Sequence, residues 1–188
     1  MKKLLIAFLV LLLTPCISSI AQEKDDAEKF GKTLNLGAGI GYYGYVGHTL
    51  PVLELNYEFD VARNFTLAPF IGFYSYTNYY YWGDYYTTYR NYSYRATVVP
   101  MGMKGTYYFD RLFHAGSDWD FYASADLGFA FTTVTWDTGY NGDRKLSNGA
   151  SPLYLDGHIG SEYHMNDKVG LFLDLSTGIS TFGLAIHF

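Results

Sequence analysis

The feature that most constrains this chain is an alternation of bulky apolar residues with small or polar ones, repeated in eight separate segments. Such a period of two is typical of β-strands, in which successive side chains point to opposite faces of the sheet. Within residues 32–44, for example, Leu34 and Leu36 alternate with Asn35 and Gly37. We therefore predict eight strands, at residues 32–44, 50–60, 65–76, 94–109, 121–135, 153–165, 169–176 and 181–188.

Glycines on the small and polar face indicate which side of this sheet is the core. On the outside of a soluble barrel, Gly37, Gly128 and Gly160 would gain nothing from lacking a side chain. In an inverted barrel the apolar face meets lipid, and small residues leave room in a narrow lumen. Closure also pairs the backbone groups of every strand, as a hydrocarbon environment requires. The pattern predicts an all-β fold, an eight-stranded antiparallel up-and-down transmembrane β-barrel.

The composition agrees with this fold and excludes other classes of protein. The chain of 188 residues is long enough for one domain, and its 49% hydrophobic and 20% aromatic content excludes disorder. Acidic residues outnumber basic ones 18 to 13, so the basic surface of a nucleic-acid-binding protein is not expected. We predict no nucleic-acid partner and no cofactor.

The N-terminus has the organisation of a secretory signal peptide. Lys2 and Lys3 precede a run of ten apolar residues, which is too short to span a bilayer as a helix. Ser19-Ile20-Ala21 then supplies the small-x-small pattern of a cleavage site. We predict a cleaved signal peptide at residues 1–21, a short charged leader at 22–31 and the barrel at 32–188.

Cys16 offers an alternative form of processing, because bacterial lipoproteins carry their lipid on such a cysteine. Pro15 occupies the position at which that signal needs a small residue, which favours simple removal of the segment. After cleavage before Gln22 the mature chain has no cysteine, so its stability does not come from disulfides.

The last eight residues carry a defined pattern. It consists of a polar residue, Thr181, a glycine, Gly183, an apolar residue, Ile186, and an aromatic residue at the end, Phe188. Together with the signal peptide and the lumen pattern, it resembles the small eight-stranded outer-membrane β-barrels of the OmpX and OmpA-barrel type in Gram-negative bacteria. The resemblance covers residues 32–188, and the interior strands carry no diagnostic motif. It implies an integral outer-membrane location, contact with lipid and lipopolysaccharide, a monomer, and a barrel-assembly machinery that reads these four residues during insertion.

Antiparallel strands place consecutive connections at alternate ends of a barrel. If both termini lie in the periplasm, the external loops are exposed at the cell surface. The periplasmic turns are then 61–64, 110–120 and 166–168, and the external loops are 45–49, 77–91, 137–152 and 177–180.

The second external connection has an unusual composition, with nine tyrosines and one tryptophan in residues 76–94. Gly83-Asp84 at its centre predicts a two-residue hairpin turn, so that the third and fourth strands continue beyond the membrane as a ribbon. Tyrosine provides rigid amphipathic contact area, which favours an adhesin-like contact with a host or cell-surface ligand. The candidate contact residues are Tyr79, Tyr80, Tyr81, Trp82, Tyr85, Tyr86 and Tyr89.

An aromatic girdle at the outer membrane interface is the alternative explanation for these tyrosines. Tyr76, Tyr92 and Tyr94 lie near the expected interface, whereas residues 79–89 lie above it. The sequence leaves both explanations open.

Charged residues also fall on the predicted lumen face, where a narrow interior cannot hold many unpaired charges. We expect the acids to pair with Arg95 or Lys104, to reach water at a rim or to hold protons. We expect the cluster to fill the barrel rather than to perform chemistry. A metal site at His158, Glu162 and His164 is rejected, because positions four or six apart on one strand are separated by roughly 13 to 20 Å. The predicted lumen charge cluster consists of Glu54, Glu58, Lys104, Asp126, Asp156, His158, Glu162 and Asp174.

Two other functions are alternatives to a structural or surface-contact role. A small pore or hydrophobic-solute conduit is disfavoured, because eight strands leave an interior just wide enough for side chains. A lipid A-modifying enzyme of similar architecture would need a histidine beside Ser or Asp at the outer edge, and only His48 falls there, with Ser75 as a remote partner. We predict that the protein is not an enzyme.

Overall fold

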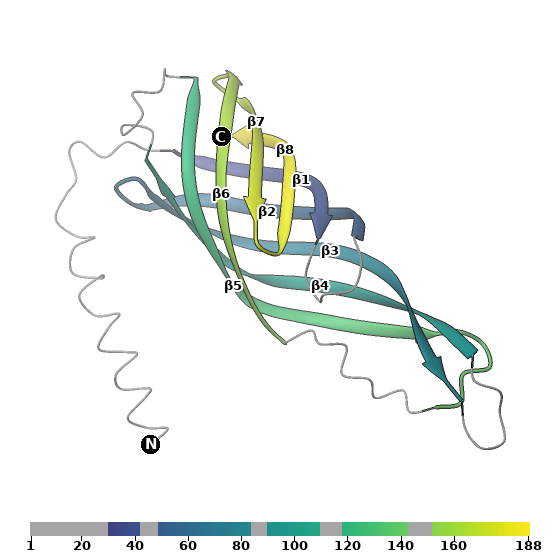
Figure 1. The fold of residues 1–188 in the computed structure, drawn as a ribbon. Helices are drawn as coiled ribbons and strands as arrows, with labels where there is room; N and C mark the ends of the chain where they lie inside the picture. Colours follow the sequence, from purple (N-terminus) through teal and green to yellow (C-terminus); the bar gives the residue numbers. More distant parts are fainter. Residues whose placement is uncertain (1–29, 42–48, 84–89, 110–117, 143–151) are drawn as a thin grey trace, which may run out of the picture.

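The computed structural model describes residues 30–41, 49–83, 90–109, 118–142 and 152–188. These residues form eight strands, shown in Figure 1. Within the described ranges, no helix is long and apolar enough to cross a membrane. The strands are β1 (Lys32–Gly41), β2 (Thr49–Ala62), β3 (Phe65–Trp82), β4 (Arg90–Tyr108), β5 (Trp119–Trp136), β6 (Leu153–Asn166), β7 (Val169–Ser176) and β8 (Ile179–His187).

The strands form one closed barrel in which each strand pairs with the next in sequence and β8 pairs with β1. All eight pairings are antiparallel, which confirms the predicted up-and-down topology. At the closing seam, Leu34 lies opposite Ile186 and Gly37 opposite Gly183. Closure depends on this last pairing, since it provides the hydrogen-bond partners for both edges of the sheet.

The wall is inverted relative to a soluble protein, as the alternation predicted. Leu155 and Phe129 are 66% and 61% exposed on the outside, whereas Asp126 and Lys104 are 1% and 4% exposed inside. A polar interior within an apolar exterior is the arrangement of transmembrane barrels. Other exposed wall residues include Leu53, Phe73, Met101, Phe131, Ile159, Leu173, Leu175 and Phe182.

Two lumen glycines show why small residues alternate with the bulky ones. A Cβ added to Gly160 on β6 would collide with the ring of Tyr122 on β5, and one added to Gly170 on β7 would collide with the carboxyl group of Glu162. Both larger side chains are buried. These glycines therefore provide the space that their neighbours fill, which supports the interpretation made from the sequence.

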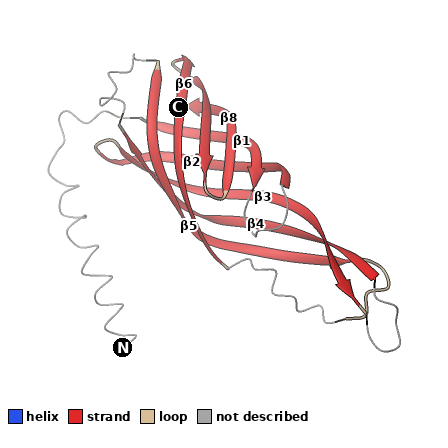
Figure 2. Cartoon of the chain, in the orientation of Figure 1, coloured by secondary structure: helices blue, strands red, loops and turns tan. Residues whose placement is uncertain are grey.

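Three strands extend well beyond the rest of the barrel (Figure 2). β3 and β4 are paired as far as Trp82 and Arg90, which agrees with the predicted ribbon. β5 joins them, because its pairing with β4 continues to Trp136 opposite Tyr94. The ribbon is therefore three-stranded where the sequence predicted two strands, and we call residues 74–82, 90–98 and 130–136 the ribbon.

The predicted turn at Gly83-Asp84 is wrong. A two-residue turn there would pair Trp82 with residue 85, but Trp82 lies opposite Arg90. The connection is therefore longer than two residues. Residues 84–89, including the candidate contact residues Tyr85, Tyr86 and Tyr89, lie outside the described part of the chain.

The described chain begins with two residues that dock onto the barrel. The backbone N–H groups of Phe30 and Gly31 each donate to a carboxylate oxygen of Asp60, both at 3.0 Å. The Phe30 ring stacks on Tyr108, with ring centroids 3.8 Å apart. The last two residues of the predicted leader thus contact the barrel. The predicted signal peptide, Cys16 and the rest of the leader lie outside the described residues.

Candidate functional site

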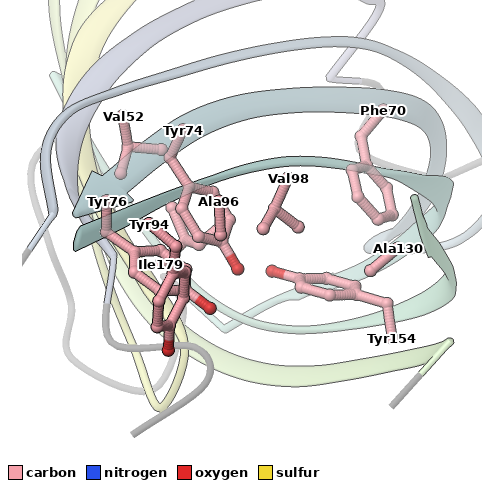
Figure 3. Close-up of a cluster of buried hydrophobic side chains, with 10 residues drawn as sticks. All are labelled: Val52, Phe70, Tyr74, Tyr76, Tyr94, Ala96, Val98, Ala130, Tyr154 and Ile179. Carbon is pink, nitrogen blue, oxygen red and sulfur yellow. The ribbon is translucent and has the colours of Figure 1, made fainter. Parts of the chain in front are cut away.

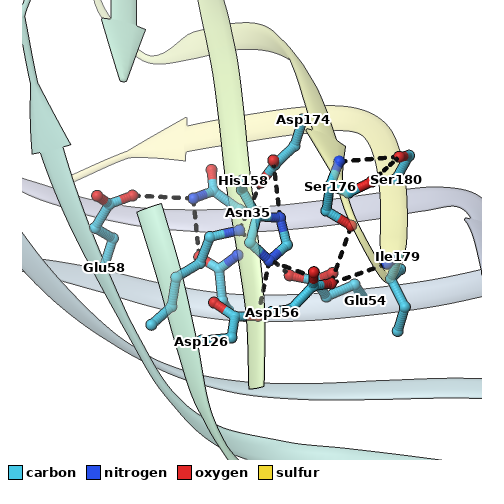
Figure 4. Close-up of polar contacts among 12 residues, drawn as sticks. Asn35, Glu54, Glu58, Asp126, Asp156, His158, Asp174, Ser176, Ile179 and Ser180 are labelled. Atoms are coloured by element: carbon cyan, nitrogen blue, oxygen red, sulfur yellow. Dashed lines mark hydrogen bonds and ion pairs between the residues drawn. The ribbon is translucent and has the colours of Figure 1, made fainter. Parts of the chain in front are cut away.

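The interior contains groups of different chemistry at different heights. We call the mouth at which Phe30 and Phe188 lie the terminal end, where the Phe188 N–H donates to the Lys32 carbonyl at 2.9 Å. The opposite mouth, from which the ribbon extends, is the ribbon end. Charged residues fill the middle of the lumen, and aromatic residues fill the part nearer the ribbon end (Figures 3 and 4).

The middle of the lumen is built around one lysine and one histidine. Lys104 on β4 pairs with Asp174 on β7 at 2.5 Å and lies 3.8 Å from Glu54 on β2. His158 on β6 bridges the carboxyl groups, with Nδ1 3.0 Å from Asp174 and Nε2 3.2 Å from Asp126. Since all five side chains are at most 9% exposed, water screens these pairs little.

Arg95 does not take part in this network, although the sequence made it a candidate partner. It lies on the outer face of β4, with its side chain exposed, whereas the neighbouring Ala96 points into the barrel. Successive residues of a strand point to opposite faces, so an odd-numbered residue of this strand cannot reach the lumen that Lys104 occupies. The expectation for Arg95 was wrong and that for Lys104 was right.

Asp156 fixes the short connection between β7 and β8. Its carboxylate accepts hydrogen bonds from the Thr177 hydroxyl at 2.6 Å, the Ser176 hydroxyl at 3.0 Å and the Ile179 N–H at 2.9 Å. His158 Nε2 lies 3.6 Å away (Figure 4). This carboxylate therefore connects the lumen network to a turn at the ribbon end.

Glu58 anchors a second polar group, nearer the terminal end. It accepts hydrogen bonds from the hydroxyls of Thr66 and Tyr108, the latter at 2.8 Å, and from the amide of Asn35 at 3.2 Å. The cavity between this group and Lys104 has a volume of only about 10 Å³, which is room for one water molecule. The predicted lumen residues thus fill the barrel with ion pairs and hydrogen-bonded carboxylates.

A buried aromatic and aliphatic layer follows toward the ribbon end (Figure 3). Tyr74 and Tyr154 are 0% and 1% exposed, and the Tyr154 ring packs 5.6 Å from Phe70. Tyr76 and Tyr94 also point inward and are buried. These two residues were candidates for an outward-facing girdle, and the inward orientation of their side chains excludes them from it.

The inner face of the ribbon carries a compact aromatic cluster. Trp136 stacks on Tyr140 with ring centroids 4.2 Å apart, and Trp82 packs against Tyr140 in an edge geometry with ring centroids 5.4 Å apart. Tyr80 and Tyr92 complete the cluster, with ring centroids 6.2 and 5.2 Å from that of Tyr140. Edge and offset contacts of this kind contribute about 0.5–1.5 kcal/mol each beyond their buried area. Tyr80 and Trp82, both candidate contact residues, therefore stiffen the ribbon.

The outer face of the ribbon presents the other two described candidates. Tyr79 and Tyr81 are 68% and 64% exposed and stand on the same side of β3, two positions apart. Ser93 and Asn91 lie opposite them on β4. Two exposed rings among small polar side chains thus rest on a sheet whose reverse side is packed.

The geometry allows the architecture to be stated. A closed antiparallel eight-stranded sheet surrounds a filled, charged lumen and carries its apolar side chains outside. This is the architecture of the small eight-stranded outer-membrane β-barrels. The barrel therefore has the fold that the C-terminal pattern implied.

Comparisons with known proteins give likeness of fold only. No family model and no curated protein matches the chain. Among solved structures, the barrel is similar to a de novo designed transmembrane β-barrel, with 12% identity, a TM-score of 0.45 and coverage of 86% of this chain and 98% of that one. It is also similar to the Yersinia pestis outer membrane protein Ail in a nanodisc, with 9% identity, a TM-score of 0.45 and coverage of 86% and 100%. Outer Membrane Protein W of E. coli has 14% identity, a TM-score of 0.41 and coverage of 88% and 100%.

The four C-terminal pattern residues lie at the seam of the barrel. Thr181 is 3% exposed, and Gly183 lies opposite Gly37, where an added Cβ would collide with the β1 backbone. Phe188 is 76% exposed at the terminal end. These residues therefore have structural roles in closure, and recognition by the assembly machinery stays a prediction.

The structure also assembles a group that the sequence analysis missed. Ligand atoms of Glu162, His164 and His187 lie within 4.8 Å of one another at the terminal end. His158, the third member of the rejected metal set, is instead bonded to Asp174 and lies near Asp126. His187 and His164 both lie on the lumen-facing side of their strands and at the terminal end, so a comparison between strands, and not only within one strand, could have predicted that they are close.

Proposed function

We propose that this protein is an integral β-barrel of the outer membrane of a Gram-negative bacterium, with lipid and lipopolysaccharide against its wall. The observation that carries the proposal is the belt of exposed apolar side chains around a charged interior. Leaving apolar surface in water costs about 25 cal/mol per Å², and soluble monomers rarely expose large contiguous apolar patches. Hydrocarbon around the wall removes that cost.

The even number of strands supports an orientation. Phe30 and Phe188 lie at the same end of the barrel, as expected for up-and-down strands. A chain that is exported first and inserted by an assembly machinery from the periplasm leaves its termini on that side. The terminal end then faces the periplasm, and the ribbon extends outward from the cell. We propose that the barrel is a monomer.

The outer face of the ribbon suits a surface-contact, adhesin-like role. Tyr79 and Tyr81 offer apolar rings with polar tips, and their conformational freedom is already limited by the strand. The aromatic cluster on the inner face, built on Trp136 and Tyr140, holds the sheet rigid, so that little entropy is lost when a partner binds. A host or cell-surface ligand would therefore meet a preformed surface.

The test removes the two exposed rings while retaining the packed face. Tyr79→Ser/Tyr81→Ser should reduce the adhesion of bacteria that display the protein to a cultured cell layer. The matched control is Tyr57→Ser/Tyr107→Ser, which removes two tyrosines of the barrel wall outside the ribbon. These side chains are 37% and 50% exposed. Unchanged adhesion by the first variant, at equal surface amounts, would contradict the contact role and leave the barrel as a structural protein.

The filled interior argues against the alternative of a pore or solute conduit. Lys104, His158 and their carboxylate partners occupy the lumen, and Tyr74 and Tyr154 close the part toward the ribbon end. The absence of enzymatic activity stays a prediction, because His48 of the remote Ser75 pair lies outside the described residues.

A further inference from the structure

A polar cavity of about 180 Å³ opens at the terminal end of the barrel, apart from the ribbon and from the charged middle of the lumen. Three of its lining residues, Glu162, His164 and His187, have ligand atoms within 4.8 Å of one another. Asp120 and Thr33 also line this cavity. We propose that Glu162, His164 and His187 bind a divalent transition-metal ion, with Zn²⁺ as the best match.

The distances bring the three donor atoms around one point. Glu162 Oε1 lies 2.7 Å from His187 Nε2 and 3.8 Å from His164 Nδ1, and the two imidazole rings have centroids 5.1 Å apart. A zinc ion binds nitrogen and carboxylate oxygen at about 2.0–2.2 Å. Small rotations of the two histidine side chains, which are 25% and 17% exposed, would therefore bring all three atoms to that distance.

The other nitrogen of each histidine already has an oxygen partner. His187 Nδ1 lies 3.0 Å from the Thr33 hydroxyl, and His164 Nε2 lies 2.8 Å from the Asp120 carboxylate. Metal-binding histidines almost always make such a second contact, which fixes the tautomer and the orientation of the ring. In the metal-bound state, with their protons on these outer nitrogens, both rings would direct a lone pair toward the ion.

Four strands contribute to this arrangement, so it does not follow from a single local motif. Asp120 comes from β5, Glu162 and His164 from β6, His187 from β8 and Thr33 from β1. Glu162 is 5% exposed, and Gly170 on β7 leaves the space that its carboxyl group occupies. The barrel therefore holds the anionic ligand in place before a metal binds.

The donor set points to the class of metal. Two imidazole nitrogens and one carboxylate oxygen suit Zn²⁺, whereas Ca²⁺ and Mg²⁺ prefer six or more oxygen ligands. Three protein ligands leave a fourth position for water. On binding, the metal takes the place of the proton between His187 Nε2 and Glu162, so binding releases a proton.

The experiment is a Zn²⁺ titration of the folded full-length mature barrel, prepared without a histidine tag and followed by calorimetry. We expect one Zn²⁺ per barrel. His187→Gln and His164→Gln should each weaken binding at least tenfold, and Asp120→Asn should weaken it by about 10- to 100-fold through loss of the outer contact. The matched control, His48→Gln, removes a histidine that precedes β2 in the sequence and is not among the proposed ligands, and this variant should bind Zn²⁺ as the parent does.

Folding of each variant is checked by its mobility on unheated SDS gels. Should His187→Gln fail to fold, His164→Gln and Asp120→Asn carry the test, because their side chains are less buried than the lumen core. Absence of Zn²⁺ binding by the folded parent, or parental affinity in the folded His164→Gln and Asp120→Asn variants, would overturn the proposal. Either result leaves the proposed contact role of the ribbon untouched.

Discussion

Lys104 is a buried cation that lies between carboxyl groups in the lumen. It is 4% exposed, and its Nζ lies 2.5 Å from the carboxyl group of Asp174 and 3.8 Å from that of Glu54. Burying charge is costly, and the cost is offset only when opposite charges and hydrogen bonds are in place. Removing the cation would leave two acids that have lost their principal partner.

We therefore expect Lys104→Met to destabilise the barrel by about 3–5 kcal/mol, the usual cost of breaking a buried ion pair from one side. The measurement is urea unfolding of the barrel in lipid bilayers. Arg95→Met, which removes an exposed cation from the same strand, is the control and should change stability by less than about 0.5 kcal/mol. Equal effects of the two substitutions would show that pairing in the lumen contributes little.

Alanine substitutions at Gly160 and Gly157 on β6 allow a second comparison, because each adds one methyl group at a different place. A Cβ at Gly160 would meet the Tyr122 ring, whereas one at Gly157 would meet nothing within 4 Å. Gly160→Ala should cost about 1–3 kcal/mol from overpacking. Gly157→Ala should be neutral or stabilise by up to about 1 kcal/mol, because it restricts the unfolded chain. Reversed signs in the same unfolding assay would contradict the packed lumen.

At the scale of elements, the sequence predicted which residues face the lumen but not which residues lie opposite one another. A period of two assigns each face without ambiguity, so Lys104, Asp126 and Asp174 were placed correctly. Pairing across strands depends on the stagger of the barrel and on loop lengths, which the alternation does not encode. For that reason the turn at Gly83-Asp84 was wrong, and the contact between His164 and His187 was missed. The expectation for Arg95 was wrong for a different reason, because the alternation along β4 already places this residue on the outer face.

The register of the ribbon gives a direct test at this scale. The structure places Tyr81 opposite Asn91. In a Cys16→Ser background, Tyr81→Cys/Asn91→Cys should therefore cross-link rapidly with a short bifunctional maleimide, as seen by a gel shift after proteolysis between the two sites. A two-residue turn at Gly83-Asp84 would instead place Asn91 opposite Tyr76. Preferential cross-linking of Tyr76→Cys/Asn91→Cys would show that the register is wrong.

At the scale of the whole molecule, the closed sheet and the inverted wall were predictable because they follow from many residues at once. Eight alternating segments with glycine on one face permit few other arrangements. The third strand of the ribbon was not predictable in the same way, since a strand predicted to residue 135 does not by itself show how far it continues beyond the neighbouring strands. Its position depends on β4, with which it pairs.

The central claim is that this barrel carries its apolar face into the outer membrane. The most direct measurement compares the mobility of the protein on SDS gels before and after boiling, in isolated outer-membrane and soluble fractions. A closed barrel whose wall pairs all eight strands should resist SDS without heating and shift on boiling, and it should be found in the outer-membrane fraction. Protein that remains in the soluble fraction and shows the same mobility before and after boiling would contradict the account.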